Sequence, residues 1–487
     1  MNSGPCRVRF QHTCVYAGVI LGLKPVPNGT ILIRRVEVSM TIRLRFLLGF
    51  FGVLGIISLV PAAGAGSATA SLPEVTCSPT PCRLPNVRIS RGLIYGTAAN
   101  LAINPGNPLQ MILGVNDGRC PAFAAAYSTS DGGSTWTKSC LPQLDPIYAD
   151  GTPVLVYDNN GMVHALTTLF NLDDGEDPSY ETHSTDNGLT WSALNLAVPV
   201  VPFSFSALDH AVVDDSLGSP FAGTIYASVE QYLSSLDVKI SVSRSTDGGV
   251  SWNRAIAASL SKTHGLYSEG FSHLAVGKDG TLYLAWMASP NGTFSPNSMM
   301  TAKSTDGGVT WSTPVLVYTA TAVNQLPNTS IASRNAPVIA IDNSAGSFAG
   351  RLYITFYNFT GTFMQVLVTS SRDGGSTWST PIPVAPPSVT HDQFLPWISV
   401  SPSGLPSVSW LDRRDDPANV GYRTYLSVSK DGGASWEQNV PFARAISQPI
   451  YGVNFPVTAW VGSTLYAVLP LRRTEGTLLE VFGGFKL

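Results

Sequence analysis

The sequence predicts an all-β protein, a seven-bladed β-propeller of four-stranded antiparallel blades, with a six-bladed propeller as the alternative. Three observations favour this fold. Glycine and proline account for 45 and 35 of the 487 residues, and no stretch beyond the N-terminal region shows sustained helical periodicity. A short turn motif recurs six times at intervals of about 60 residues. An apolar strand recurs seven times with the same period.

The composition indicates a folded chain with few charges. Charged residues make up 13% of the sequence, about half of the roughly 25% that is usual in soluble proteins. Hydrophobic residues at 44%, ten tryptophans and a net charge of −3 exclude global disorder. A pI near 6.2 without a lysine or arginine run argues against a nucleic-acid partner, because such binding neutralises several phosphates with a basic face.

Residues 40–70 have the pattern of a secretory signal peptide. Arg43 and Arg45 precede an uncharged apolar run from Phe46 to Val60, and small residues follow. An uncleaved anchor is the alternative, but this run would reach only about 22 Å as a helix, less than the roughly 30 Å hydrocarbon core. We therefore expect a secreted, periplasmic or cell-envelope protein without a stable membrane span after cleavage. Residues 1–39 are interpreted as an upstream extension or a disordered segment outside the fold.

Four cysteines follow the signal peptide, and export permits disulfides. Cys77 and Cys82 lie in residues 71–85, interpreted as an N-terminal linker, and Cys120 and Cys140 bracket a predicted hairpin. Four cysteines allow three pairings, of which we favour these two local ones. Zinc-ligand spacing is absent from the sequence.

The turn motif combines Ser or Thr, Asp, Gly and Trp at fixed positions. Its six copies, called the repeat turns below, are Thr129–Trp136, Ser184–Trp191, Ser245–Trp252, Ser304–Trp311, Ser371–Trp378 and Ser429–Trp436. The carboxylate of such a turn accepts backbone N–H bonds, and its glycine is free to adopt a positive φ. We therefore interpret the repeat turns as structural, on the outer rim, rather than as metal or substrate ligands.

The recurring strand carries a polar residue where it begins. The seven copies begin at Asn100, Asp150, Asp209, Glu269, Asn335, Asp392 and Asn454. After the last of them only three strands remain before the chain ends. We expect residues 86–90 to supply the missing fourth strand, so that the ring closes without an unpaired edge and the propeller spans residues 86–487.

The innermost strand of each blade lines the central channel of a propeller, so these seven strand starts should converge on one face. The candidate ligand-binding residues there are Asp150, Asp209, His210, Arg334, His391 and Asp392. The alternative is that such groups satisfy strand ends and channel water. We expect no cofactor, although calcium remains an alternative because it prefers hard oxygen ligands.

The repeat turns resemble the Asp-box, or bacterial neuraminidase repeat, and the chain resembles the sialidase-like superfamily along nearly all of its mature length. The resemblance implies a site that holds a substrate carboxylate with three arginines and attacks with a tyrosine whose proton a glutamate withdraws. Carried over by motif, Arg83 in Cys82–Pro85 resembles the first arginine and Arg423 the third. Glu269 resembles the glutamate and Tyr451 the nucleophile.

Two positions depart from the sialidase pattern. The second arginine should end the strand where this chain has Ala285–Met287, which carries no charge. The acid/base aspartate should follow Asp117–Arg119, but residues 120–127 contain no carboxylate. A seventh blade also departs from the six-bladed sialidase fold.

Residues 410–417 concentrate five charges in a chain that has few. Their signs alternate through Asp412, Arg413, Arg414, Asp415 and Asp416. Internal ion pairing within a loop is the favoured interpretation, and contact with a carboxylate or sugar acid is the alternative.

The sequence leaves three hypotheses for function. The first is a monomeric propeller that binds a glycan or an extracellular protein at the channel face, without efficient hydrolysis. The second is an exo-α-sialidase or related glycoside hydrolase, with Asp150 or Asp209 supplying the acid. The third is a structural scaffold of the cell envelope.

Overall fold

The computed structural model describes residues 80–90, 100–121, 123–144, 148–150, 153–171, 177–198, 205–234, 237–258, 268–289, 297–331, 333, 335–443, 446–448, 455–472 and 478–487. The predicted signal peptide, the upstream extension and Cys77 lie outside these residues. All regular structure in the described part of the chain is β-strand, arranged in seven antiparallel sheets. These sheets are numbered below as blades in chain order.

The first four blades follow one another along the chain. Blade 1 contains β3 (Leu101–Ile103), β4 (Met111–Asn116), β5 (Ala124–Thr129) and β6 (Thr137–Cys140). Blade 2 contains β7 (Tyr148–Asp150), β8 (Val154–Tyr157), β9 (Val163–Asn171), β10 (Ser179–Ser184) and β11 (Asn195–Val198). Blade 3 contains β12 (Phe205–Val213), β13 (Ile225–Ser234), β14 (Asp237–Ser245) and β15 (Asn253–Ala258). Blade 4 contains β16 (Ser268–Val276), β17 (Leu282–Ser289), β18 (Asn297–Ser304) and β19 (Val315–Ala320).

The last three blades complete the set. Blade 5 contains β20 (Val338–Ile341), β21 (Leu352–Phe359), β22 (Met364–Ser371) and β23 (Ile382–Pro383). Blade 6 contains β24 (Gln393–Val400), β25 (Pro406–Asp412), β26 (Arg423–Val428) and β27 (Glu437–Pro441). Blade 7 contains β28 (Thr458–Val461), β29 (Thr464–Arg472) and β30 (Leu478–Lys486), joined by β1 (Cys82–Arg83) and β2 (Val87–Arg88).

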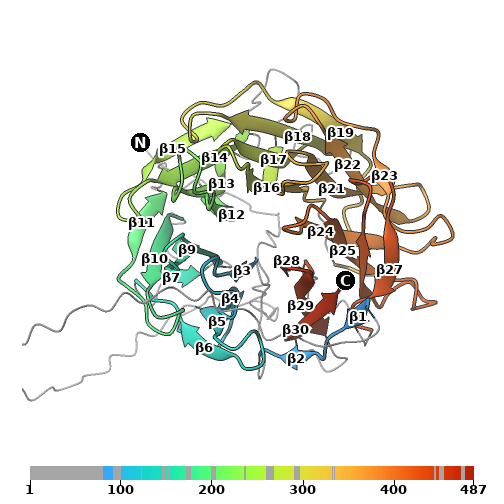
Figure 1. Ribbon diagram of the computed structural model, residues 1–487, viewed down its shortest axis with the longest axis horizontal. Coiled ribbons are helices and arrows are strands. Elements are labelled where there is room, and N and C mark those ends of the chain that lie inside the picture. Colours follow the sequence, from blue (N-terminus) through green and yellow to red (C-terminus); the bar gives the residue numbers. More distant parts are fainter. Residues whose placement is uncertain are drawn as a thin grey trace, which may run out of the picture. The chain divides into compact units, whose positions relative to one another are not determined.

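The blades form a closed ring, which is visible in Figure 1. Each innermost strand contacts the next around the ring, through β3, β8, β12, β16, β20, β24 and β28, and β28 contacts β3 again. The predicted seven-bladed propeller is therefore confirmed.

The ring is closed by the N-terminal strands, as predicted from the three-strand C-terminal remainder. Both β1 and β2 pair antiparallel with β30, with Cys82 opposite Lys486 and Val87 opposite Phe482. One correction follows. Because β1 already begins at Cys82, the last blade extends into residues 71–85, which the sequence assigned to a linker.

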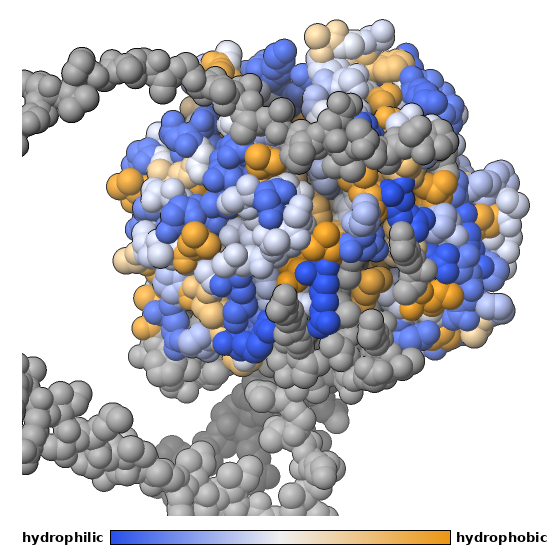
Figure 2. Space-filling model, turned by 60° about the horizontal axis from the view of Figure 1, so that its bottom comes forward, coloured by the Kyte–Doolittle hydropathy of each residue, from blue (hydrophilic) through white to orange (hydrophobic). Residues whose placement is uncertain are grey.

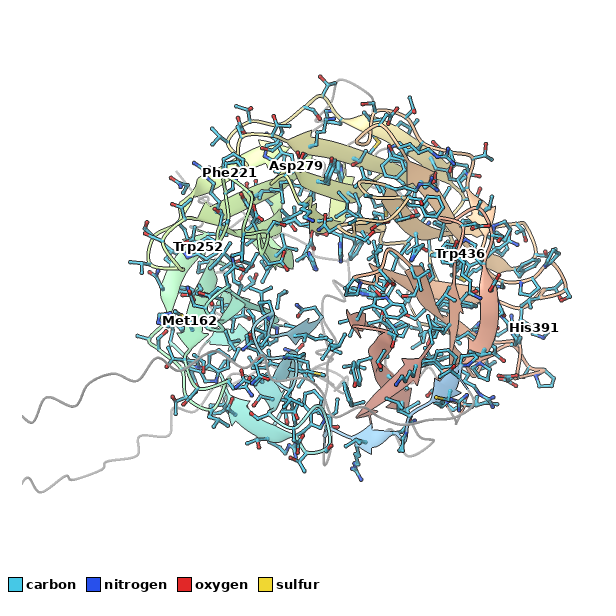
Figure 3. All side chains as sticks on the ribbon, viewed as in Figure 1. Met162, Phe221, Trp252, Asp279, His391 and Trp436 are labelled. Atoms are coloured by element: carbon cyan, nitrogen blue, oxygen red, sulfur yellow. A yellow bond between two sulfur atoms is a disulfide. The ribbon has the colours of Figure 1, made fainter. Side chains whose placement is uncertain are left out.

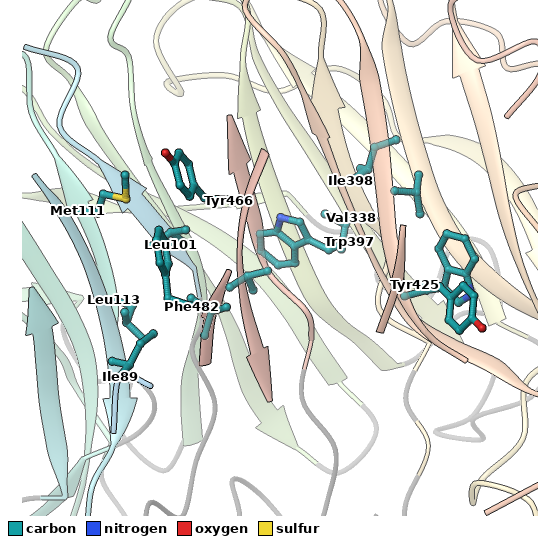
Figure 4. Close-up of a cluster of buried hydrophobic side chains, with 14 of the residues drawn as sticks. Ile89, Leu101, Met111, Leu113, Val338, Trp397, Ile398, Tyr425, Tyr466 and Phe482 are labelled. Carbon is teal, nitrogen blue, oxygen red and sulfur yellow. The ribbon is translucent and has the colours of Figure 1, made fainter. Parts of the chain in front are cut away.

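The hydrophobic core lies between neighbouring blades rather than inside one sheet. Leu166 of blade 2 and Ile225 of blade 3 belong to one cluster, and Tyr226 of blade 3 packs with Leu284 of blade 4 in the next. The largest cluster joins blades 1, 5, 6 and 7, with Trp397 among its members (Figure 4). Burial of apolar surface thus holds adjacent blades together.

Figure 2 shows a face on which hydrophilic and hydrophobic residues are interspersed. Among the described residues, no helix is long and apolar enough to cross a membrane.

Each repeat turn joins the last two strands of its blade and has the hydrogen bonds that its sequence predicts. In Ser371–Trp378, Asp373 Oδ1 accepts the backbone N–H of Thr377 at 2.9 Å, and its Oδ2 accepts the Thr377 hydroxyl at 2.6 Å. The Ser371 hydroxyl accepts the N–H of Gly375 at 2.9 Å, and Gly375 has a φ of 82°. The structural interpretation of this turn is confirmed.

One predicted disulfide is confirmed and the other is not tested. Cys120 and Cys140 are bonded, which ties the end of β6 to the loop after β4. Cys82 is also disulfide-bonded. Because Cys77 lies outside the described residues, its pairing with Cys82 stays a prediction.

The charge cluster at residues 410–417 forms internal pairs, as favoured from sequence. Arg414 Nη2 lies 2.5 Å from Asp412 Oδ2, and Arg423 Nη1 lies 3.2 Å from Asp415 Oδ2. The Asp416 carboxylate accepts backbone N–H groups from residues 418, 420 and 421. These charges therefore stabilise the loop between β25 and β26.

Ring closure by the N-terminal strands predicts a length threshold for stability. A chain beginning at Ile89 lacks β1 and β2, leaves the edge of β30 unpaired, and should lose several kcal/mol of stability or aggregate. A chain beginning at Ser71 is the matched control and should melt normally. Thermal unfolding with light scattering makes the comparison, and equal melting of the two chains would contradict closure.

The turn carboxylates predict a loss of stability in acid. Hydrogen bonds from the Thr377 hydroxyl and backbone lower the pKa of Asp373 to about 2, from an ordinary 3.8. Its contribution is present above the ordinary pKa and is lost as pH falls towards 2. In Asp373→Asn the free energy of unfolding should therefore decrease less between pH 3.8 and pH 2 than in the wild type, as measured by urea unfolding. Glu437→Gln, at an exposed position in another blade, should not.

Candidate functional site

Three innermost strands carry β-bulges at the same height in their blades. The register shifts before His210 in β12, before His273 in β16 and before Trp397 in β24. Each of these residues pairs with the fourth residue of the adjacent strand, which places the three bulges at one level. Two bulge residues, Phe271 and Leu395, have positive φ values of 54° and 48°. Strain of this kind is concentrated at functional sites.

The bulges bring three ring side chains together at the axis of the propeller. The imidazoles of His210 and His273 stack with centroids 3.7 Å apart, and Trp397 meets His273 edge-on at 5.1 Å. These residues come from blades 3, 4 and 6. Because blades 4 and 6 are not neighbours, their side chains can meet only across the centre of the ring.

Two carboxyl groups lie beside these rings and satisfy the backbone of the β16 bulge. Asp209 Oδ2 accepts the N–H of Ser272 at 2.8 Å and its hydroxyl at 2.6 Å. Glu230 Oε1 accepts the N–H of Phe271. Gly270 makes room for this, since a Cβ there would lie 2.7 Å from Glu230 Oε1. The axial cluster is defined here as Asp209, His210, Glu230, Ser272, His273 and Trp397.

The Asp209 carboxyl keeps its proton to a higher pH than an isolated carboxyl does, because its pKa is raised. Burial first, and then the charge of Glu230, raise the pKa of Asp209 well above its ordinary value, while the bonds from Ser272 oppose the rise. Glu230 is 1% exposed. Asp209 lies deep in the ring but keeps part of its surface exposed.

Both imidazoles of the axial cluster are neutral. Burial lowers the pKa of His210 to about 3. Burial, and then the neighbouring His210, lower the pKa of His273 below its ordinary value. The backbone N–H of Leu274 donates to His210 Nδ1 at 3.3 Å, while neither ring nitrogen of His273 makes a hydrogen bond of normal geometry with a described residue. Neutral imidazoles offer one donor and one acceptor each.

Asp392 lies in a different environment from Asp209. Its Oδ2 is 3.1 Å from Arg413 Nη1, and both side chains are fully buried. Its Oδ1 accepts the N–H of Met364 in blade 5, and Arg413 donates to the carbonyl of Pro327 at 2.7 Å. Asp392 therefore ties blade 6 to blade 5. His391, beside it in sequence, lies at the periphery in Figure 3.

The other predicted channel residues either donate hydrogen bonds to backbone carbonyls or lie outside the described residues. Asn100 donates to the carbonyl of Leu155 at 2.6 Å, and Asn335 to that of Tyr357 at 2.7 Å. Arg334, Tyr451 and Asn454 lie outside the described residues, as do the side chains of Asp150 and Glu269. The backbone of these last two belongs to β7 and β16.

The described counterparts of the sialidase residues are dispersed. Arg83 lies on β1, the outermost strand of blade 7, and donates to the carbonyl of Pro441. Arg423 pairs with Asp415. The strand expected to carry the second arginine presents the fully buried Trp286.

The loop expected to carry the acid/base aspartate contains an internal ion pair instead. Arg119 Nη2 lies 2.5 Å from Asp117 Oδ2, which also accepts the Tyr127 hydroxyl at 2.7 Å. Asp117 is fully buried. The Asp117 carboxylate is therefore already bound by Arg119 and Tyr127.

Four members of the axial cluster were not singled out from sequence. Glu230, Ser272, His273 and Trp397 each lie inside a strand rather than at its start. Their sequence signal is weak: the pairs Asp209–His210, Ser272–His273 and Pro396–Trp397 each place a ring residue a few positions into an innermost strand.

A metal site is not evident in the described part of the chain. No group of three or more His, Cys, Asp or Glu side chains there is arranged to hold a metal ion.

Comparisons with known proteins agree with the fold. Residues 231–458 match the model of the BNR repeat-like domain. The resemblance to proteins with this repeat is thereby confirmed over these residues. No curated protein matches the chain.

Several solved structures share the fold of this chain. An ulvan lyase of a polysaccharide lyase family has a TM-score of 0.53 and 10% identity, covering 82% of this chain and 95% of its own. An intramolecular trans-sialidase from Ruminococcus gnavus has a TM-score of 0.44 and 14% identity, and the match covers 65% of this chain and 89% of the trans-sialidase chain. NanB sialidase from Streptococcus pneumoniae has a TM-score of 0.46 and 10% identity, and the match covers 69% of this chain and 68% of the NanB chain. At these identities the likeness shows the fold alone.

The raised pKa of Asp209 predicts that stability falls with rising pH. Between the ordinary and the raised pKa, the folded chain binds more protons than the unfolded chain, so the free energy of unfolding decreases as pH rises through this window. Asp209→Asn keeps the acceptor for Ser272 but removes the titration, and should flatten this decrease. Urea unfolding between pH 4 and about 8 measures it. Glu437→Gln is the control, and a decrease equal in Asp209→Asn would contradict the assignment.

Proposed function

We propose that the protein is an exported, sialidase-like propeller that binds a glycan at the axial cluster and does not efficiently hydrolyse sialosides. The observation that supports this most is the meeting of the carboxyl pair, two neutral imidazoles and Trp397 at the ring axis. Export rests on the signal-peptide pattern of residues 40–70.

The chemistry of the axial cluster suits sugar hydroxyl groups. A hydroxyl both donates and accepts, so it is matched by carboxylates that accept and by neutral imidazoles that do both. Asp209 and His273 keep partial exposure, whereas Trp397 is buried in the largest hydrophobic cluster. A few polar groups set on an apolar base are typical of small-molecule sites. The polysaccharide lyase that shares the fold adds support for a sugar ligand.

The positions of the arginines argue against sialidase hydrolysis. Arg83 is on the outermost strand of its blade, and Arg423 is paired with Asp415. Trp286 occupies the strand expected to carry the second arginine.

The loop expected to carry the acid also lacks a free carboxylate among its described residues. Loss of general acid catalysis alone typically lowers the rate by 10² to 10⁴-fold.

Two alternatives keep a specific basis. An exo-α-sialidase or related glycoside hydrolase would use Asp209 or Asp150 as its acid, and the raised pKa of Asp209 favours that residue for the role. The second alternative is that the propeller binds an extracellular protein or serves as a scaffold in the cell envelope, and it would use the ring as a binding surface without catalysis.

We propose a monomer without cofactor or nucleic-acid partner. Calcium is the alternative cofactor.

Enzyme assays separate these functions. Purified mature protein should release little or no product from a fluorogenic sialoside or from a sialyl-oligosaccharide, because the described arginines are committed elsewhere. Robust turnover of both, abolished by Tyr451→Phe and by Glu269→Gln, would establish the sialidase alternative. Turnover abolished by Asp209→Asn but retained in Tyr451→Phe would instead identify Asp209 as the acid of a different hydrolase.

A further inference from the structure

One contact between a repeat turn and the preceding blade, called a joint here, is built from ionisable groups. In four joints, the second glycine of the turn packs against an apolar or aromatic side chain of the preceding blade: Phe482, Ile112, Tyr226 and Tyr353. In the joint between blades 2 and 3, a Cβ at Gly249 would instead lie 2.8 Å from Glu181 Oε1. Because Glu181 is buried, a carboxylate takes the place of an apolar contact there.

A buried imidazole lies between this carboxylate and a second one. His164 Nδ1 is 2.8 Å from Glu181 Oε1, and His164 Nε2 is 3.9 Å from Asp158 Oδ2. All three side chains are buried. His183 is partly exposed, and its Nδ1 lies 3.5 Å from the same oxygen of Glu181. The joint cluster is defined here as Asp158, His164, Glu181 and His183.

The two carboxylates favour the protonated form of the His164 ring. Burial lowers the pKa of His164, but the hydrogen bonds and charges of Asp158 and Glu181 outweigh burial, so the pKa is raised above the ordinary 6.5. The carboxyl groups of Asp209 and Glu230 point towards blade 4 instead. In the described part of the chain, the other charged side chains on the packed elements are Asp186, Asp214, Asp215, Lys239 and Asp247.

His183 occupies a position that carries a permanent cation in the next two blades. It directly precedes its repeat turn, as Arg244 and Lys303 do in blades 3 and 4. Those two side chains donate to glycine carbonyls of the following turns at 2.9 and 3.0 Å. In blade 2, Asn195 donates to the carbonyl of Gly249 at 2.7 Å instead. This joint therefore holds titratable imidazoles where the next joints hold side chains that stay charged.

We propose that the joint cluster is a pH-sensitive device, which holds blades 2 and 3 together while His164 is protonated and loosens their contact as pH rises. Loss of the proton leaves the carboxylates of Glu181 and Asp158 buried beside a neutral ring, which opposes the packing. The loosening reaches β12, because the N–H of Leu208 donates to Thr168 of β9 across the same joint at 2.9 Å. The device operates whether or not the protein binds a glycan.

Hydrogen exchange with mass spectrometry on the mature chain tests the response between about pH 5.5 and 9. The contribution of His164 is fully present below pH 6.5 and is lost as pH rises through its higher folded pKa. After correction for the intrinsic exchange rate, local opening of residues 179–191 and 245–252 should therefore increase with pH, by at most about tenfold per pH unit. Residues 352–371 of blade 5 should show no such increase. Equal behaviour of the two regions overturns the proposal.

Variants assign the response to His164. His164→Gln should abolish the increase, and the control His391→Gln, at the periphery in Figure 3, should retain it. His183→Gln should also retain it, because the His164 ring keeps both carboxylates. Circular dichroism verifies folding. If His164→Gln does not fold, Glu181→Gln removes the nearer carboxylate and should move the increase to lower pH. An unchanged increase in the folded variant, His164→Gln or Glu181→Gln, overturns the proposal.

Discussion

The contact between each repeat turn and the preceding blade is the constraint on which the ring depends. Arg244 of blade 3 donates to the carbonyl of Gly307 in the next turn at 2.9 Å, and Lys303 of blade 4 donates to that of Gly374 at 3.0 Å. The second turn glycine must lack a side chain. At Gly133, a Cβ would lie 2.0 Å from the ring of Phe482 in blade 7. Adjacent blades are thus fixed in angle as well as in contact.

The fixed angle between blades determines what the centre of the ring can contain. Innermost strands of neighbouring blades are in contact, so any side chain that a bulge turns inward meets others from distant parts of the sequence. His210, His273 and Trp397 meet in this way, and the carboxyl groups that stabilise one bulge lie beside them. The regular part of each blade supports the ring, while the irregular positions supply the candidate chemistry.

The repeat could be predicted from sequence because turns and apolar strands leave a periodic pattern. The number of blades and the closing role of residues 86–90 followed from it. The centre of the ring could be predicted only in part. Asp209 and His210 were included because the sequence predicts a strand that begins at Asp209, although β12 begins at Phe205. Glu230 and His273 depend on bulges whose register leaves no pattern in sequence. Arg83 carries a family-like motif, but pairing with β30 places it on an outer strand.

Closure by the two ends of the chain also constrains the order of events in folding. β1 and β2 lie at the start of the propeller, and their partner β30 is its last strand. Contacts between such distant segments form slowly, and unpaired strand edges are exposed until they form. Blades 1 to 6 can assemble as an open arc, and the ring closes only when β1 and β2 pair with β30.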